Sequence, residues 1–364
     1  MGFRCGIVGL PNVGKSTLFN ALTSSAAAAA ANYPFCTVEP NIGNIPVPDV
    51  RLKHLAVSER SEKIIPTKVE FVDIAGLVKG ASQGEGLGNQ FLGHIRNVDA
   101  IVYVLRCFDD DDIIHVEGRV DPVSDAKIIK LELALADIES LQRRLATWEK
   151  KAKYDKEIAK QLELTKKIIE AFNANANIQD IIRCESEKDV QALQLLSTKP
   201  FFYGCNVKER DVIYGNQYTE QIAKLAISEQ TESIIISAKI ESEIANLRDE
   251  DEKQLFLADI GLKQGGLEKI ITCGYKTLGL STFFTIGPKE ARAWTIKQGT
   301  PAPQAAGVIH SDFEKGFICA EITSYEDYVV CGNMKQAKEA GKVRLEGRDY
   351  AIKEGDIVHF RFNV

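Results

Sequence analysis

The chain has 364 residues, of which 45% are hydrophobic and 26% are charged. This length and composition exclude a mostly disordered chain and predict a globular protein of two or three structural units. The 45 Lys and Arg residues against 51 Asp and Glu residues give a net charge of −6, which excludes a global basic field for nucleic acid or anionic lipid.

Membrane and metal signals are missing from the sequence. No run of about 18 apolar residues occurs, and the first residues lack the layout of a signal peptide. We therefore expect a cytoplasmic protein without a membrane partner. The eight cysteines are scattered singly without a CxxC pair, so buried reduced thiols are expected rather than a zinc or redox site.

The first predicted strand, residues 4–8, runs directly into GLPNVGKS at residues 9–16, which matches GxxxxGK[ST] and precedes a helix-like segment. In such a P-loop the glycines let backbone N–H groups surround phosphates. Lys15 would reach the β- and γ-phosphates as a catalytic group, and Ser16 would offer its hydroxyl to Mg²⁺. The sequence therefore predicts a bound nucleoside triphosphate.

Two later segments complete the predicted phosphate site. Thr37 lies in a segment without regular period, where it could complete the Mg²⁺ shell as a first switch. Asp73 follows the predicted strand 69–72, where a carboxylate would hold Mg²⁺ through water, and the Gly76 N–H would meet the γ-phosphate. The glycines that continue to residue 88 predict a second switch loop.

Leu77 occupies the position where many GTPases place the glutamine that orients the attacking water, so we expect slow intrinsic hydrolysis. Three ways to position water stay open: another side chain, a monovalent cation such as K⁺ near Asn12, or a partner. His115 is the nearest titratable candidate, although on chemistry alone it is an ordinary surface histidine.

Further apolar runs at residues 100–107, 200–205 and 233–237 alternate with helix-length segments, which predicts an α/β protein with a parallel-type central sheet. Between the first two runs, apolar residues recur every three or four positions on either side of a break near Tyr154 and Asp155. This pattern predicts an inserted helical coiled-coil hairpin. The first stripe consists of Leu131, Leu135, Ile138, Leu141, Leu145, Trp148 and Ala152.

Residues 127–167 contain eleven Lys or Arg against seven Asp or Glu, a surplus of four positive charges. The hairpin could therefore contact RNA. The competing interpretation, that these charges form the solvated faces of two helices, is the more common case for such a pattern.

Base recognition is predicted at the ends of the last two strands of this sheet. Guanine readers carry NKxD, whose Asp accepts hydrogen bonds from guanine, whereas this chain has NVKE at residues 206–209. Asn206 can instead pair with N6 and N7 of adenine. The segment Ser237, Ala238 and Lys239 follows the next strand. ATP is thus favoured over GTP, with a tolerant GTPase as the alternative.

After residue 279 short strands are separated by Gly and Pro, which predicts a small β-rich C-terminal domain. The expected strands are residues 283–286, 291–296, 317–322, 343–345 and 357–362.

Taken together, the chain closely resembles the YchF or Obg-like ATPase family over essentially its whole length. The segments that carry the resemblance are NVGKST, NYPFCTVEPN, DIAGLVKGASQGEGLGNQF, NVKE and RAWTIKQGTPAPQAAGVIHSDFEKGF. It implies an ATP-preferring G domain with a coiled-coil insertion, and a C-terminal β-grasp module called TGS that is associated with ribosome and RNA contacts. The expected boundaries are 1–124 and 199–280 for the G domain, 125–198 for the insertion and 281–364 for TGS.

The resemblance also implies roles for single residues. Asn206 and the backbone of Val207 would contact adenine, and Ser16 and Thr37 would bind Mg²⁺. His115 becomes a candidate catalytic helper. Nucleotide contacts are implied at Asn12, Val13, Gly14, Lys15, Ser16 and Thr17.

We therefore expect a slow Mg²⁺-dependent ATPase that acts as a switch on the ribosome or RNA. One alternative is a GTPase of the translation-factor type. Another is a nucleotide-gated RNA- or ribosome-binding module in which turnover is incidental. The sequence implies no oligomer.

Overall fold

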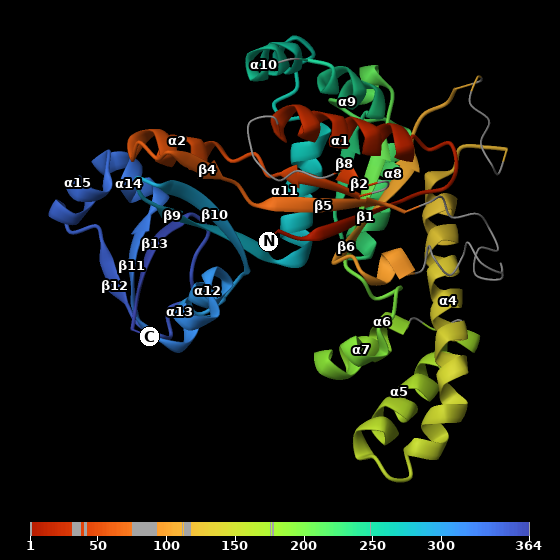
Figure 1. Cartoon of the computed structure of the whole chain (residues 1–364). Coiled ribbons are helices and arrows are strands. Elements are labelled where there is room, and N and C mark those ends of the chain that lie inside the picture. Colours follow the sequence, from red (N-terminus) through yellow and green to blue (C-terminus); the bar gives the residue numbers. More distant parts are fainter. Residues whose placement is uncertain are drawn as a thin grey trace. The chain divides into compact units, whose positions relative to one another are not determined.

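The computed structural model describes residues 2–30, 38–39, 42–74, 93–110, 112, 118–174, 176, 178–247 and 249–363 (Figure 1). The chain divides into two compact units. The first consists of Met1–Cys5, Ser16–Phe71 and Ile236–Val364, and the second of Gly6–Lys15 and Val72–Ile235. No helix in the described part of the chain is both long enough and apolar enough to cross a bilayer.

One sheet has seven strands in the order β2-β3-β5-β1-β6-β7-β8. All five strands predicted for it from apolar runs are confirmed. β6 and β7 pair in parallel as expected, whereas β2 and β3 form an antiparallel pair, so the sheet is mixed. Every residue of β6 is buried, as expected of a continuous apolar run inside a parallel sheet. The strands are β1 Arg4–Val8, β2 Val38–Glu39, β3 Ile42–Pro46, β5 Lys68–Asp73, β6 Ala100–Arg106, β7 Phe201–Asn206 and β8 Ser233–Ile236.

Helices follow several of these strands, and the alanine run at residues 26–30 forms the end of the first of them. The helices are α1 Lys15–Ala30, α6 Ile178–Arg183, α7 Glu187–Leu193, η2 Glu209–Asp211, α8 Gln217–Ser228, α9 Ala238–Ala245, α10 Glu250–Asp259 and α11 Gly266–Leu278.

The predicted two-helix hairpin is present as α4, Pro122–Lys151, and α5, Lys156–Asn173 (Figure 1). The break is where the sequence predicts it, because Asp155 accepts backbone hydrogen bonds as the N-cap of α5. The apolar residues between the outer half of α4 and α5 are Ile138, Leu141, Leu164 and Ile168, which pack with Leu193 and Leu195.

The predicted apolar stripe of α4 is wrong at its start, because Leu131 is exposed. Helix α4 packs on β6 and α8 as well as on α5, and its first half buries a different helix face, which includes Ile129 and Leu133. Lys130 anchors this half by an ion pair with Glu229.

The second sheet has six strands in the order β12-β11-β13-β9-β10-β4, and all five C-terminal strands predicted from the sequence are confirmed. Both faces of this sheet are covered. Phe283 and Phe284 are successive residues of β9 and belong to two different apolar cores, as strand geometry requires. The elements are β4 Lys63–Ile65, β9 Leu280–Ile286, β10 Glu290–Lys297, α12 Ala302–Ile309, α13 Ser311–Lys315, β11 Phe317–Ser324, α14 Tyr325–Cys331, α15 Met334–Glu339, β12 Arg344–Glu346 and β13 Asp356–Phe362.

The sequence places residues 50–65 in the first part of the G domain, whereas their helix and strand are built into the second sheet. β4 pairs in parallel with β10, from Lys63 beside Glu290 to Ile65 beside Arg292. Helix α2, Val50–Ser58, buries Leu52, Leu55 and Ala56 in the core that contains Phe284. This helical spacing of three and four places all three side chains on one face.

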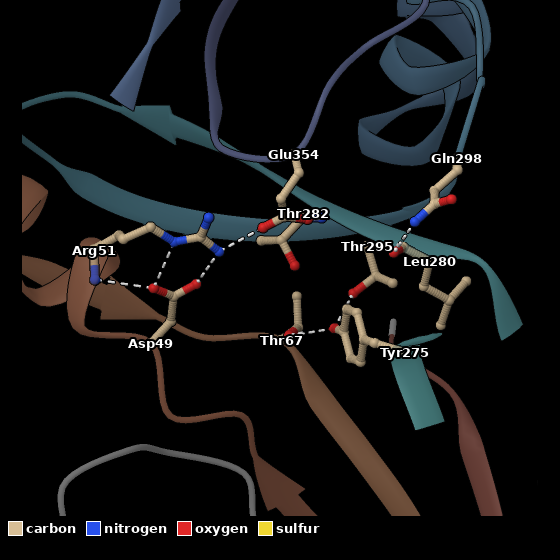
Figure 2. A network of polar contacts seen from close by, with 9 residues as sticks. All are labelled: Asp49, Arg51, Thr67, Tyr275, Leu280, Thr282, Thr295, Gln298 and Glu354. Atoms are coloured by element: carbon tan, nitrogen blue, oxygen red, sulfur yellow. Dashed lines mark hydrogen bonds and ion pairs between the residues drawn. The ribbon is translucent and has the colours of Figure 1, made fainter. Parts of the chain in front are cut away.

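Polar contacts add to this attachment (Figure 2). Arg51 pairs with Asp49, the N-cap of α2, at 2.8 Å, and with Glu354 at 2.6 Å. The Glu354 carboxylate also accepts the Thr282 N–H at 2.7 Å. The segment around α2 is therefore tied to the C-terminal strands by charge as well as by apolar burial.

Leu55→Ala should destabilise the second sheet by about 2–5 kcal/mol, because Leu55 is 0% exposed in its core. The change is measured by urea unfolding, with Trp294 fluorescence as the signal. Trp148 is replaced by Phe in all variants so that Trp294 is the one remaining tryptophan. Val57→Ala on the same helix is the control, since Val57 is 76% exposed and its truncation should cost less than about 0.5 kcal/mol. Equal shifts for the two variants would contradict this packing of α2.

Candidate functional site

The phosphate-binding loop lies between β1 and α1, as predicted. Asn12 has φ 64° and Gly14 has φ 92°, both in the left-handed region. A Cβ atom on Gly9 would lie 2.7 Å from the carbonyl oxygen of Val104 in β6. Glycine is thus required at position 9 for close packing and favoured at position 14 for its backbone angle.

Lys15 and Asp73 are brought together at this loop. The Lys15 ammonium forms an ion pair with the Asp73 carboxylate at the end of β5, and Lys15 is only 8% exposed. Their side chains lie in a largely buried environment, where charges interact more strongly than in water. The arrangement provides one cation suited to phosphate and one carboxylate suited to a hard metal ion.

The donor set fits Mg²⁺, which prefers oxygen ligands and usually takes one or two of them from the protein. Asp73 supplies a carboxylate, and Ser16 follows Lys15 in the first turn of α1 with an exposed side chain. Thr17 is exposed as well. Thr37, the third predicted metal ligand, lies outside the described residues.

Asn206, the predicted base reader, also supports the phosphate loop. Its side chain is buried, and its Nδ2 donates a hydrogen bond to the Val13 carbonyl oxygen at 2.9 Å. The Asn206 carbonyl oxygen accepts the Cys107 N–H at 2.9 Å. An amide nitrogen carries two protons, so the bond to Val13 uses one of them. Val207, the next residue, is buried.

The loop after β6 is organised by Arg106, a residue that sequence reasoning missed. Its buried guanidinium donates to the carbonyl oxygens of Phe108 at 3.1 Å and of Asp110 at 3.0 Å. A charged residue at the end of an otherwise apolar strand is the one signal that could have identified it.

Lys208 of the NVKE segment connects this loop to β7 through an ion pair with Asp110 at 3.4 Å. The pKa of Asp110 is lowered, first by the hydrogen bond from the Asp112 N–H and then by Lys208. The carboxylate therefore stays ionised, and the pair links the segment that follows β7 to the one that follows β6.

The second predicted base segment begins α9. Ser237 is buried and caps this helix, with its hydroxyl accepting the Ile240 N–H at 3.5 Å. Ala238 is buried and Lys239 is exposed. Ser237 thus has a structural role in starting the helix. This role is separate from the predicted contact between the turn and the base.

Glu241 fixes the position of α9 and was also missed by sequence reasoning. Its buried carboxylate accepts the Gly266 N–H at 2.6 Å and the Leu267 N–H at 3.4 Å, which caps the start of α11. Burial raises the pKa of Glu241, and these two hydrogen bonds oppose the increase. A Cβ on Gly266 would lie 2.9 Å from the Glu241 carboxyl group, so a larger residue there would displace this side chain.

Three predicted site residues cannot be placed. Thr37, Gly76 and His115 lie outside the described residues, as does Leu77. Their roles therefore stay predictions.

Two family models match the sequence. A model described as 50S ribosome-binding GTPase matches residues 4–174. The model YchF-GTPase_C, described as a protein of unknown function, matches residues 280–363. The first match covers β1, the phosphate loop and the hairpin, and the second covers the strands of the second sheet from β9 onward.

Solved structures agree with this assignment. The chain matches the structure of the Schizosaccharomyces pombe YchF GTPase with a TM-score of 0.82 and 37% identity, covering 99% of this chain and 98% of that one. A GTP binding protein from Pyrococcus horikoshii OT3 matches with a TM-score of 0.63 at 19% identity, which shows the shared fold.

Curated relatives match from end to end. The chain is 52% identical over 368 residues to the ribosome-binding ATPase YchF of Bacillus subtilis (strain 168) and 51% identical over 366 residues to that of Haemophilus influenzae, covering 100% of every chain. About half of all positions are therefore identical along the full length, and the chain belongs to the YchF family.

Proposed function

We propose that this protein is a Mg²⁺-dependent ATPase that hydrolyses ATP slowly to ADP and phosphate and acts as a molecular switch on the ribosome. The observation that carries the proposal is the buried Lys15 held beside Asp73 at the phosphate loop. The bacterial relatives are named ribosome-binding ATPases, which favours the same nucleotide and partner. A protein that works with ribosomes would act in the cytoplasm.

In this proposal the residues of the P-loop hold the phosphates, and Asn206, Val207 and the turn at Ser237, Ala238 and Lys239 contact the base. Ser16, Thr37 and Asp73 hold Mg²⁺, which would neutralise phosphate charge. The Gly76 N–H meets the γ-phosphate. K⁺ near Asn12 remains an additional candidate for the charge that assists hydrolysis.

The domain roles follow the resemblance described above. Residues 1–124 and 199–280 would form the G domain, residues 125–198 the insertion, and residues 281–364 a TGS domain. Nucleotide binding would change the shape that the insertion and the TGS domain present to ribosome or RNA.

Lys15→Ala should weaken ATP binding by about 10- to 150-fold, because charge-assisted hydrogen bonds to phosphate contribute about 1.5–3 kcal/mol. Isothermal titration calorimetry with ATP and Mg²⁺ measures the affinity. Lys224→Ala removes an exposed lysine of α8 and should bind ATP like the unmodified protein. ATP binding by Lys15→Ala at full strength would contradict the assignment of the phosphate site.

ATP should bind at least about ten-fold more tightly than GTP, because guanine finds no Asp where NKxD would supply one and unpaired polar groups discriminate strongly. Competition of unlabelled ATP and GTP against a fluorescent ATP analogue measures the ratio. The Schizosaccharomyces pombe relative is named a GTPase, so the measured ratio distinguishes an ATP-preferring protein from a GTP-preferring one. Ten-fold tighter GTP binding would make the interpretation of residues 206–209 wrong.

His115→Ala should lower turnover by about ten-fold or more without lowering ATP affinity, if His115 assists proton transfer or positions water. Phosphate release assays and ribosome co-sedimentation are measured together, with His359→Ala, which removes an exposed histidine of β13, as the control. Lost turnover with unchanged ATP-dependent co-sedimentation would favour the nucleotide-gated module. Unchanged turnover would remove His115 from the catalytic residues.

A further inference from the structure

The turn between α4 and α5 lies at the end of the hairpin that is farthest from β6 and β7 (Figure 1). We call residues 149–157 the hairpin tip. It carries Lys150, Lys151, Lys153 and Lys156 together with Tyr154, and all five side chains are exposed. Tyr154 is 92% exposed, so its ring contributes almost nothing to packing.

The acidic residues of the hairpin tip form no ion pair with these lysines, and each has another partner. Glu149 pairs with Lys166 at 3.1 Å, Asp155 accepts the N–H groups of Glu157 at 2.9 Å and Ile158 at 3.3 Å, and Glu157 pairs with Lys188 at 3.9 Å. Within the part of the chain that the structure describes, none of the four tip lysines forms an ion pair. The tip therefore presents four exposed lysines without an ion-pair partner in the described residues, on a chain of net charge −6.

Helix stability does not account for the whole patch. Lys150 and Lys151 lie in the last turn of α4, where the helix dipole favours cations. Lys156, in contrast, is the first residue of α5, where the same dipole disfavours a cation. Tyr154 gains no burial in the turn. Neither the helix dipole nor packing within the hairpin therefore explains the positions of Lys156 and Tyr154.

We propose that the hairpin tip binds RNA at an unpaired base and its flanking phosphates. Lysine ammonium groups pair with phosphates as point charges, and an exposed aromatic ring offers a face on which a base can stack. The proposal deepens the proposed ribosome association and rests on it, since it names the part of the chain and the chemistry of the contact.

The chemistry of the tip favours RNA over a lipid surface. Stable attachment of a basic segment to a membrane needs a second, hydrophobic signal. Ala152 is the one aliphatic residue of the hairpin tip, and the first two residues of α5, Lys156 and Glu157, are charged. The exposed Tyr154 ring, in contrast, can stack on an unpaired base of RNA.

The test uses the full chain and a fluorescein-labelled RNA stem-loop with an unpaired loop, measured by anisotropy over a range of salt concentrations. Replacing Lys150, Lys151, Lys153 and Lys156 by Gln should weaken binding at least about ten-fold. It should also reduce the slope of log K against log salt by about 3, since each lost phosphate contact removes about 0.7. Unchanged affinity and slope would overturn the proposal.

The control removes positive charge from the same hairpin but outside the tip. Lys160 and Lys167 are ion-paired with acidic residues outside the tip, and replacing both by Gln should change RNA affinity by less than about three-fold. Circular dichroism checks that both variants keep their helices. An equal loss in the two variants would overturn the assignment to the tip.

Tyr154→Ala should weaken RNA binding by about 5- to 150-fold, the range expected for one stacked base, whereas Tyr154→Phe keeps the ring and should retain binding. A loss in both variants would overturn the stacking contact. Binding of the unmodified chain to phosphatidylserine vesicles but not to RNA would overturn the proposal in favour of a membrane.

ATP affinity, measured in parallel, separates this proposal from the function on which it rests. All tip variants should bind ATP like the unmodified chain, because none of these residues belongs to the phosphate site. If the unmodified chain does not co-sediment with ribosomes, the ribosome is refuted as the partner. Binding to the RNA stem-loop tests the hairpin tip independently of that result.

Discussion

The hydrogen bond from the Asn206 side chain to the Val13 carbonyl oxygen fixes the phosphate loop against the end of β7. A donor outside the loop thus satisfies the carbonyl oxygen that lies between the left-handed residues at positions 12 and 14. The donor is buried, which strengthens the bond and makes its loss costly. Asn206 is also the predicted contact for the base, so in the proposed complex phosphate and base recognition would depend on one amide.

The ion pair between Lys15 and Asp73 sets the electrostatics of this loop. Removing one partner of a largely buried pair leaves an uncompensated charge, which typically costs about 3–5 kcal/mol. In the proposed complex, the triphosphate would give Lys15 a new anionic partner, and Mg²⁺ would give Asp73 a new cationic one. Each charge would then remain compensated, which is a physical reason for the triphosphate and the metal to bind together.

Local signals predicted much of this structure. The P-loop was predictable because its glycines, lysine and serine have fixed mechanical roles within eight consecutive residues. Ten strands were predictable from apolar runs bounded by turn residues. Residues whose burial depends on distant partners were not predictable. Arg106 and Glu241 appear in the sequence as ordinary charged residues, and only the fold shows that their side chains are enclosed and hydrogen-bonded.

The same limit explains the error in the apolar stripe of α4 and the strand pairing that the sequence did not predict. Leu131 fits the apolar stripe of α4, yet the helix changes its packing partner along its length and exposes this residue. Strand β4 has only three residues and finds its partner β10 more than 200 residues later in the chain, so no local pattern reveals it. Periodicity identifies an element but does not identify its neighbour.

The position of β4 has a mechanical consequence within the first unit. β4 ends at Ile65 in the second sheet, and β5 begins at Lys68, so Pro66 and Thr67 alone connect them. The Thr67 hydroxyl lies 3.2 Å from the Tyr275 hydroxyl, which in turn lies 2.8 Å from the Thr295 hydroxyl of β10 (Figure 2). A two-residue link that is also hydrogen-bonded has little freedom to absorb displacement. The start of β5 is therefore held close to β10 within the first unit.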